Sequence, residues 1–334
     1  MRIAIDAFGG DNAPLEILKG AVLAKQYGEQ LVLVGSEQEI RSCAQANGVD
    51  LSGIEIMDAK TVMDMHDEAK AVLKAKADSS MSVGLRAVAA GEADAFVTAG
   101  PTGAALMGAT MIVKRIKGVK RPALCVVIPS AKKPYLLIDC GANAECRPEM
   151  LNQFAVMGSV YMEKVMGYEN PRVGLANNGA EDSKGTELQV EAYKLLKAND
   201  QINFIGNAEG RDVPSGDYDV IVADGFTGNI ILKLTEGLAS ALMSMLKEVF
   251  YQSTLSKLAA AVLKPGLRGF KNKMDYTKYG GAPIIGLQKP VVKAHGSSNA
   301  EAIKNAVRQA IDWSRSGVTE ALTEKLGRQT DAEE

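Results

Sequence analysis

Short apolar runs that end in a polar or glycine-rich loop, each followed by a helical stretch, recur along this chain of 334 residues. The clearest example is the segment 172–187, RVGLANNGAEDSKGTE. It reads as a buried strand from Val173 to Ala176, a tight loop from Asn177 to Gly179, and a helix start carrying Ser183 to Thr186. Strands that alternate with helices predict an α/β fold with a doubly wound, mainly parallel sheet.

Five of the predicted strands end in loops of similar chemistry. These loops are Asp6 to Gly10, Gly100 to Gly103, Asp139 to Asn143, Asn177 to Lys184 and Asp224 to Asn229. In doubly wound sheets the ligand crevice lies beyond the carboxyl ends of the strands, so we expect the loops to meet at one rim. None of the loops has the dinucleotide fingerprint or the Walker pattern, so neither type of nucleotide is indicated.

The loop that holds Lys184 suits an anion. The first N–H groups and the positive dipole end of the following helix would point back at the strand tip. Lys184 adds a mobile ammonium there. This segment alone favours a solvated surface lysine, whereas the repetition of such loops favours a cradle for phosphate or for a developing oxyanion.

Composition and charge exclude several classes of protein. The 38 basic and 40 acidic residues give a net charge of −2, which does not indicate a nucleic-acid partner. Four scattered cysteines and two histidines lack the clustering of a zinc site, and we predict neither a metal nor a cofactor. The N-terminal apolar run is too short for a signal peptide, which predicts a cytoplasmic protein with reduced thiols.

The longest apolar-rich stretch runs from Ile230 to Phe250. It is interrupted by Lys233, Glu236 and Lys247. The pattern predicts a soluble amphipathic helix rather than a membrane span, since a spanning helix needs about 20 predominantly apolar residues.

Four segments carry a family resemblance: IDAFGGDNAP, DCGANAECRPEMLNQFA, NNGAEDSKGTE and ADGFTGNIILK. They resemble the signature segments of the bacterial phosphate acyltransferase family of phospholipid synthesis, and the resemblance covers essentially the whole chain. It implies transfer of an acyl group from acyl-acyl carrier protein to inorganic phosphate, giving acyl phosphate for a downstream membrane glycerol-phosphate acyltransferase. It also implies a homodimer without cofactors, and a fold similar to phosphotransacetylases and isopropylmalate dehydrogenases. We expect one catalytic domain, 1–334, with a helical protrusion at 240–280.

The resemblance also implies site residues, of which Lys184 and Asn229 are the critical pair. We expect Lys184 to hold phosphate and Asn229 to donate to the thioester oxygen, although Asn229 is also placed to be a helix N-cap. Asp6 and Asp224 are also candidates for binding phosphate or substrate, but a carboxylate repels phosphate unless it is protonated or paired, so a structural or orienting role is favoured. Further binding candidates are the glycines and neutral donors Gly9, Gly10, Asn143, Asn178, Gly179, Thr227 and Gly228, and His295. His295, in KAHGSS, reads either as a site residue or as a packed, hydrogen-bonded histidine.

Residues 251–278 are locally basic in a chain that is nearly neutral. Five apolar residues there fall at helical spacing: Leu255, Leu258, Ala259, Val262 and Leu263. The pattern predicts an interfacial element on an anionic membrane surface, at the inner face of the cell membrane. A helix pair that packs a dimer is an equally good interpretation of the same stripe.

Three rival functions remain at this stage. A phosphotransacetylase that uses coenzyme A would need the same residues. A non-catalytic membrane adaptor would not need Lys184 and Asn229 at one crevice. A dehydrogenase of the related fold would need a nucleotide site and a carboxylate cluster for a divalent metal, which the strand-end aspartates do not supply convincingly.

Overall fold

The structure is a computed structural model that describes residues 1–253, 255–257, 260, 262–263, 266, 269 and 279–331. Within them, one sheet of eleven strands has the order β3-β2-β1-β4-β11-β10-β5-β6-β9-β7-β8. The strands are β1 (Arg2–Asp6), β2 (Gln30–Gly35), β3 (Glu55–Asp58), β4 (Ala95–Thr98), β5 (Ala123–Ile128), β6 (Tyr135–Ile138), β7 (Arg172–Asn177), β8 (Asn203–Glu209), β9 (Val220–Val222), β10 (Ala282–Ile285) and β11 (Val291–Lys293).

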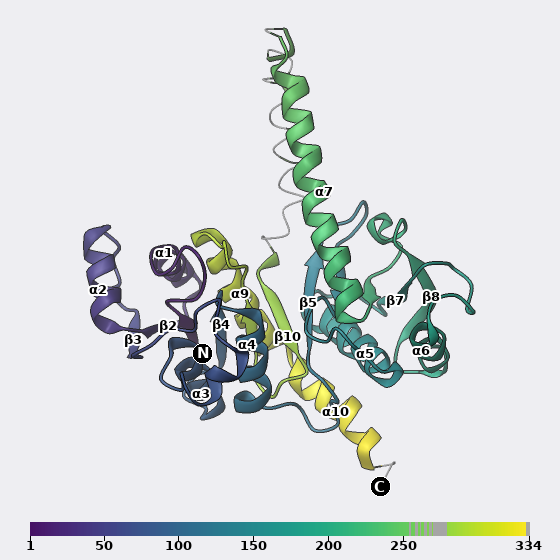
Figure 1. The fold of residues 1–334 in the computed structure, drawn as a ribbon, viewed down its shortest axis with the longest axis horizontal. Helices are drawn as coiled ribbons and strands as arrows, with labels where there is room; N and C mark the ends of the chain where they lie inside the picture. Colours follow the sequence, from purple (N-terminus) through teal and green to yellow (C-terminus); the bar gives the residue numbers. More distant parts are fainter. Residues whose placement is uncertain are drawn as a thin grey trace.

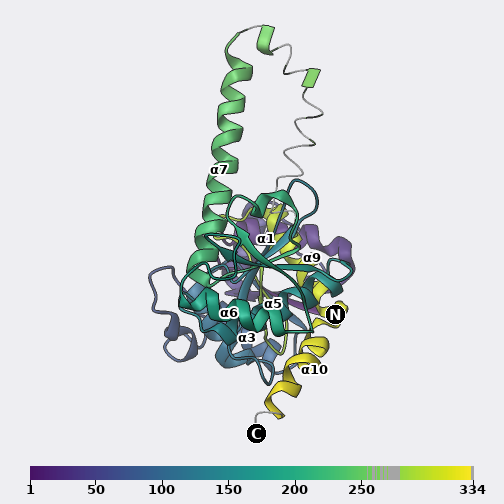
Figure 2. The same cartoon turned by 90° about the vertical axis from the view of Figure 1, so that its right-hand side faces the viewer.

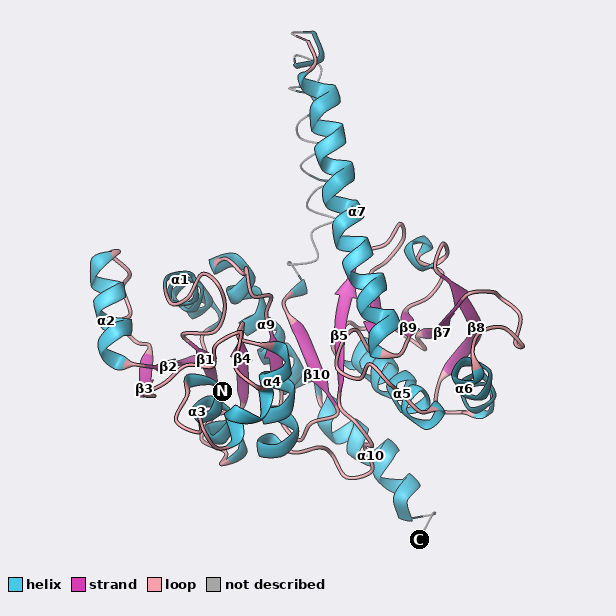
Figure 3. Cartoon of the chain, in the orientation of Figure 1, coloured by secondary structure: helices cyan, strands magenta, loops and turns pink. Residues whose placement is uncertain are grey.

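Helices cover both faces of this sheet (Figures 1 and 3). They are α1 (Leu15–Ala24), α2 (Glu37–Ala46), α3 (Ser80–Ala89), α4 (Thr102–Gly108), α5 (Pro148–Lys164), α6 (Glu187–Ala198), α7 (Gly225–Tyr251), α9 (Ala300–Ser316) and α10 (Val318–Asp331). Alternate residues of a strand enter different cores, as Ile3 and Ile5 of β1 pack on one side and Ala4 on the other. The first core includes residues of α1, α5 and α9, and the second includes residues of α3, α4 and the start of α7.

The direction of the strands reverses across the middle of the sheet. Strands β1, β2, β3, β4 and β11 are parallel to one another, as are β6, β9, β7 and β8. Three successive antiparallel pairings, β11–β10, β10–β5 and β5–β6, separate the two halves. The carboxyl ends of the halves therefore point in opposite directions, and the expectation of a single rim is wrong.

Helix α7 projects far beyond the rest of the molecule (Figures 1 and 2). Of its 27 residues only Gly225, Gly228 and Leu232 are buried. The predicted apolar stripe on its surface is exposed and comprises Ile230, Leu234, Leu238, Leu242 and Met245. By length and composition α7 is long and apolar enough to cross a membrane. Its three charged residues therefore do not exclude a membrane span, contrary to the expectation from the sequence.

The predicted membrane-contact residues lie beyond α7. Leu255, Val262 and Leu263 are exposed. Leu258 and Ala259 lie outside the described residues.

Candidate active site where the two halves of the sheet meet

A cavity of about 270 Å³ brings strand-end residues from both halves of the sheet together. It is lined by Thr102, Leu124, Val126, Cys140, Gly141, Asn229, Leu232, Lys233, Glu236, Gly280, Gly281, Ala282, Lys293, Ala294, His295, Ser298 and Ala302. Thr102 follows β4 and His295 follows β11, whereas Cys140 follows β6 and Asn229 follows β9. The site is thus built from loops of opposed strands rather than from one rim.

Asn229 lies on the cavity wall at the start of α7, with an exposed side chain. It is not the N-cap of the helix, so that interpretation of the sequence was wrong. Asp224 is the cap: its carboxylate accepts from the backbone N–H and the hydroxyl of Thr227, each at 2.8 Å. Capping gives Asp224 a structural role and leaves the amide of Asn229 available to the cavity.

Gly228 holds α7 against the end of β6. A Cβ atom at this position would lie 1.9 Å from the carbonyl oxygen of Asp139, where no carbon atom fits. Gly225 makes a similar approach, because its N–H donates to the carbonyl of Asn143 at 2.7 Å. The two glycines let the first turn of α7 carry Asn229 into the site.

Asp139 is fully buried and organises the loop after β6. It accepts from the backbone N–H groups of Leu124, Ala142 and Asn143 and from Asn143 Nδ2, at 2.7–3.1 Å. Burial raises the pKa of its carboxyl group, which these hydrogen bonds oppose. Asn143 Nδ2 also donates to the carbonyl of Pro122 at 2.9 Å. The side chains predicted as substrate donors at Asn143 and Thr227 therefore donate within the protein, and neither residue lines the cavity.

The loop after β1 supports the site from outside the cavity. Asp6 is buried and accepts from the hydroxyl of Thr98 at 2.7 Å and from the N–H of Phe8, and burial raises the pKa of its carboxyl group. Gly9 has no room for a side chain, since a Cβ atom would lie 2.6 Å from the backbone nitrogen of Gly100. Gly10 has a φ of +98°, a conformation that favours glycine.

His295 lies at the mouth of the cavity on the loop after β11. Its side chain is exposed rather than packed. Nδ1 accepts from the backbone N–H of Ser297 at 3.2 Å and lies 2.8 Å from the Ser297 hydroxyl. In the neutral ring the proton therefore resides on Nε2, which makes this nitrogen a donor. The loop is fixed to the β1 loop, because the N–H of Asp11 donates to the carbonyl of Gly296 at 2.8 Å.

Lys184 is not among the residues that line this cavity. The helix α6 begins at Glu187 with Thr186 as its cap, so Lys184 belongs to an exposed loop rather than to a helix start. The loop is held by Asn177 Nδ2, which donates to the carbonyl of Lys184 at 3.0 Å. Asn178, Gly179 and Lys184 do not line the cavity that contains Asn229. The strand before their loop, β7, is the parallel neighbour of β9, which precedes Asn229.

Sequence reasoning missed Lys293, which ends β11 and is buried in the cavity wall. Burial lowers the pKa of its ammonium to about 8. A lysine directly after the buried pair Val291 and Val292 was the available signal, because an ionisable group at the end of a buried strand requires an explanation.

The other groups at the site offer little nucleophilic chemistry. The thiol of Cys140 is buried in the cavity wall, and burial raises its pKa well above the ordinary value. Within the described ranges, no three His, Cys, Asp or Glu side chains are grouped so that they could hold a metal ion.

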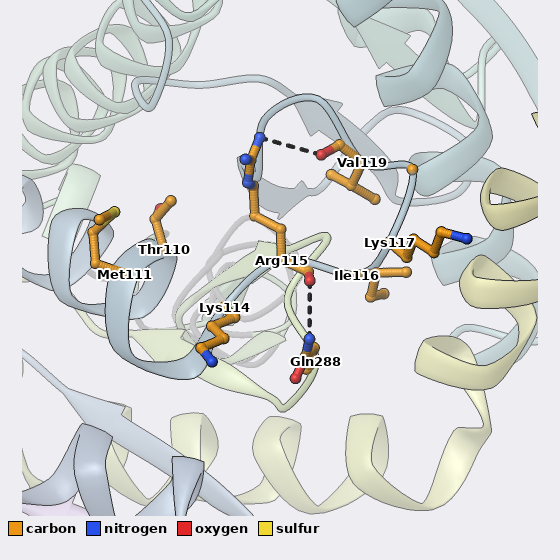
Figure 4. Close-up of a pocket in the computed structure, with 9 residues that line it drawn as sticks. Thr110, Met111, Lys114, Arg115, Ile116, Lys117, Val119 and Gln288 are labelled. Carbon is orange, nitrogen blue, oxygen red and sulfur yellow. Dashed lines mark hydrogen bonds between the residues drawn. The ribbon is translucent and has the colours of Figure 1, made fainter. Parts of the chain in front are cut away.

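A second cavity, of about 400 Å³, lies elsewhere (Figure 4). It is lined by Thr110, Met111, Lys114, Arg115, Ile116, Lys117, Gly118, Val119 and Gln288. The lining of this cavity is basic, but the guanidinium of Arg115 is engaged within the protein: it donates to the backbone carbonyls of Val119 and Lys120. Gln288 in turn donates to the carbonyl of Arg115 at 3.2 Å. These bonds fix a loop, and none of the strand-end site residues lies there.

Comparison with known proteins settles the family. A family model described as fatty acid synthesis protein matches residues 1–321. The phosphate acyltransferase of Alkaliphilus oremlandii is 48% identical over 100% of this chain and 99% of its own. The phosphate acyltransferase of Clostridioides difficile is 45% identical over 98% of this chain and 97% of its own. The chain belongs to the phosphate acyltransferase family. The resemblance seen in the sequence and the class of enzyme, an acyltransferase of lipid synthesis, are confirmed.

Solved structures confirm the predicted fold. A phosphotransacetylase from Streptococcus pyogenes has a TM-score of 0.67 at 18% identity, over 94% of each chain. A branched-chain phosphotransacylase from Enterococcus faecalis has 0.58 at 17% identity, over 95% of this chain and 99% of that one. A putative 4-hydroxythreonine-4-phosphate dehydrogenase from Salmonella typhimurium has 0.53 at 14% identity, over 93% and 99%. At these identities the likeness concerns the fold alone.

Proposed function

We propose that this enzyme transfers a long-chain acyl group from acyl-acyl carrier protein to inorganic phosphate. A phosphate oxygen attacks the thioester carbonyl, the C–S bond breaks, and the carrier leaves as its thiolate, which gives acyl phosphate. Phosphate is already anionic at neutral pH, so the reaction needs positioning and charge stabilisation rather than a strong base. The observation that carries the proposal is the exposed amide of Asn229 in a cavity that also contains a buried ammonium.

Asn229 donates through its side-chain amide to the thioester oxygen as negative charge develops there. Loss of one such donor typically costs about 10²–10³ in rate. The Nε2–H group of His295, at the same cavity, is a second neutral donor. Lys184 supplies a further positive charge from its exposed loop, and this role requires the loop to approach the bound phosphate.

We propose that the product is consumed at a membrane. The exposed apolar side chains of Leu255, Val262 and Leu263 insert into an anionic membrane surface. The positive charge of Lys257 is attracted to the acidic lipid headgroups. The exposed stripe of α7 then packs a homodimer. This arrangement makes residues 1–334 one catalytic domain with a protrusion at 240–280. It locates the enzyme on the inner face of the cell membrane, next to the glycerol-phosphate acyltransferase.

The identity of the acyl donor decides between this function and a phosphotransacetylase that uses coenzyme A, whose fold is similar. Purified protein is mixed with palmitoyl-acyl carrier protein or palmitoyl-coenzyme A, with and without phosphate, and thiol release is followed. Phosphate-dependent release from the carrier alone supports the proposal. Release from coenzyme A alone changes the donor class, and release from neither, with intact vesicle binding, indicates an adaptor.

A further inference from the structure

Lys293 is the most buried charged side chain among the residues that line the candidate cavity. Its ammonium donates to the backbone carbonyl of Ala99 at 3.3 Å and to that of Ala294. An ammonium has three N–H donors, so these two bonds leave one donor unused. Both acceptors are neutral carbonyl oxygens, so they satisfy N–H groups of Lys293 without cancelling the charge of its ammonium.

No carboxylate of the described residues forms an ion pair with Lys293. Asp6 and Asp11 act on it through their charge only, and the carboxylate of Asp6 already accepts from Thr98 and from the backbone. The positive charge of Lys233 on α7 repels that of Lys293 and lowers its pKa further. Lys233 is itself paired with Glu236 at 2.8 Å. A buried ammonium without a counter-ion is costly, and an anionic ligand would remove much of that cost.

We infer that Lys293 is the phosphate-binding residue of this cavity: its unused N–H donates to a phosphate oxygen, while the side-chain amide of Asn229 donates to the thioester oxygen. The inference rests on the proposed function and assigns the phosphate subsite within it. It also separates two lysines. Lys293 binds phosphate in the cavity wall, whereas Lys184 adds positive charge from an exposed loop outside that wall.

The subsite depends on pH in a defined direction. With a pKa of about 8, Lys293 is mostly protonated at neutral pH and loses its charge as the pH rises through that value. Phosphate affinity must therefore fall above about pH 8. Phosphate itself undergoes its second ionisation near neutral pH, and the side chains of His295 and Glu236 share the cavity with Lys293. The other charged groups that act on Lys293 are Asp6, Asp11 and Lys233, of which Lys233 is paired with Glu236.

The test compares Lys293→Met, Lys293→Arg and the wild-type enzyme, with phosphate varied at saturating acyl donor. Lys293→Met should raise the KM for phosphate about 10- to 100-fold, the usual effect of losing a hydrogen bond from a charged group, and leave the KM for the acyl donor unchanged. Lys293→Arg keeps the charge, so it should recover part of the affinity and extend the alkaline limit beyond pH 9. Lys194→Met is the matched control, because Lys194 is exposed on α6 and paired with Glu191.

A binding measurement separates this inference from the proposed reaction. Phosphate alone should raise the melting temperature of the wild-type protein and of Lys194→Met, but not that of Lys293→Met. Lys293→Met should itself be at least as stable as wild type without phosphate, because an apolar side chain replaces an unpaired buried charge. Wild-type protein that binds phosphate but makes no acyl phosphate refutes the reaction and keeps the subsite. A KM for phosphate within twofold of wild type in Lys293→Met, or an unshifted alkaline limit in Lys293→Arg, overturns the inference; if Lys293→Met fails to fold, Lys293→Arg decides.

Discussion

Gly228→Ala tests whether the close packing of α7 on β6 positions the site. The added Cβ atom would lie 1.9 Å from the carbonyl oxygen of Asp139, whereas an ordinary contact is 3.4 Å or more. The backbone of α7 must therefore move by about 1.5 Å, the difference between these distances, because a main-chain carbonyl in a buried loop cannot yield as a flexible side chain does. Overpacking of this kind costs about 1–3 kcal/mol of unfolding free energy.

The functional consequence is larger than the loss of stability. Asn229 follows Gly228 directly, so the displacement moves its amide by a similar distance. A shift of about 1 Å at a reacting centre can cost about 10²-fold in rate. We expect Gly228→Ala to fold, to unfold at lower denaturant concentration with an unchanged m-value, and to release carrier thiol about a hundred times more slowly.

Gly237→Ala is the matched control in the same helix. A Cβ atom at Gly237 meets nothing within 4 Å. The higher helix propensity of alanine should therefore stabilise the protein by up to about 1 kcal/mol and leave turnover unchanged. The reasoning is refuted if Gly228→Ala matches Gly237→Ala in both stability and rate.

Three further substitutions test separate parts of the account. Asn229→Ala should lower kcat by about 10²–10³ without changing the unfolding midpoint, since the side chain is exposed on the cavity wall, and near-normal turnover would reject its role as a donor. Asp224→Ala removes the N-cap of α7 and should cost about 1 kcal/mol in denaturant unfolding; an unchanged midpoint would show that the cap does not hold the helix. Val262→Asp should release the protein from anionic vesicles and leave turnover of soluble substrate intact, whereas loss of the dimer or of the fold would favour the packing interpretation.

Local pattern predicted most of the individual elements. The strand predicted from Val173 to Ala176 is confirmed within β7, because it is a short apolar run that ends in turn residues. By contrast β11 lies between β4 and β10, almost two hundred residues after β4 in the chain, and no local signal encodes that insertion. The second half of the sheet is reversed by the antiparallel pairing of β5 with β6, since β10 is antiparallel to both β11 and β5 and so leaves β5 parallel to β11.

The site shows the same division between local and long-range information. For Asp224 the sequence offered a local argument, the repulsion between a carboxylate and phosphate, and in the structure this carboxylate caps α7. The start of α6 was predicted too early, since Gly185 has a φ of +95° and the helix begins only after Thr186. Lys293 was missed because its burial depends on Ala99, which is distant in sequence.

The most direct test of the central claim is phosphorus NMR of the purified enzyme with palmitoyl-acyl carrier protein and inorganic phosphate. The account predicts a new phosphorus resonance that grows with the released carrier thiol and disappears when hydroxylamine is added. It predicts the same resonance, strongly slowed, with Asn229→Ala. Thiol release that needs no phosphate, or that gives no new phosphorus species, would contradict the claim that phosphate is the acyl acceptor.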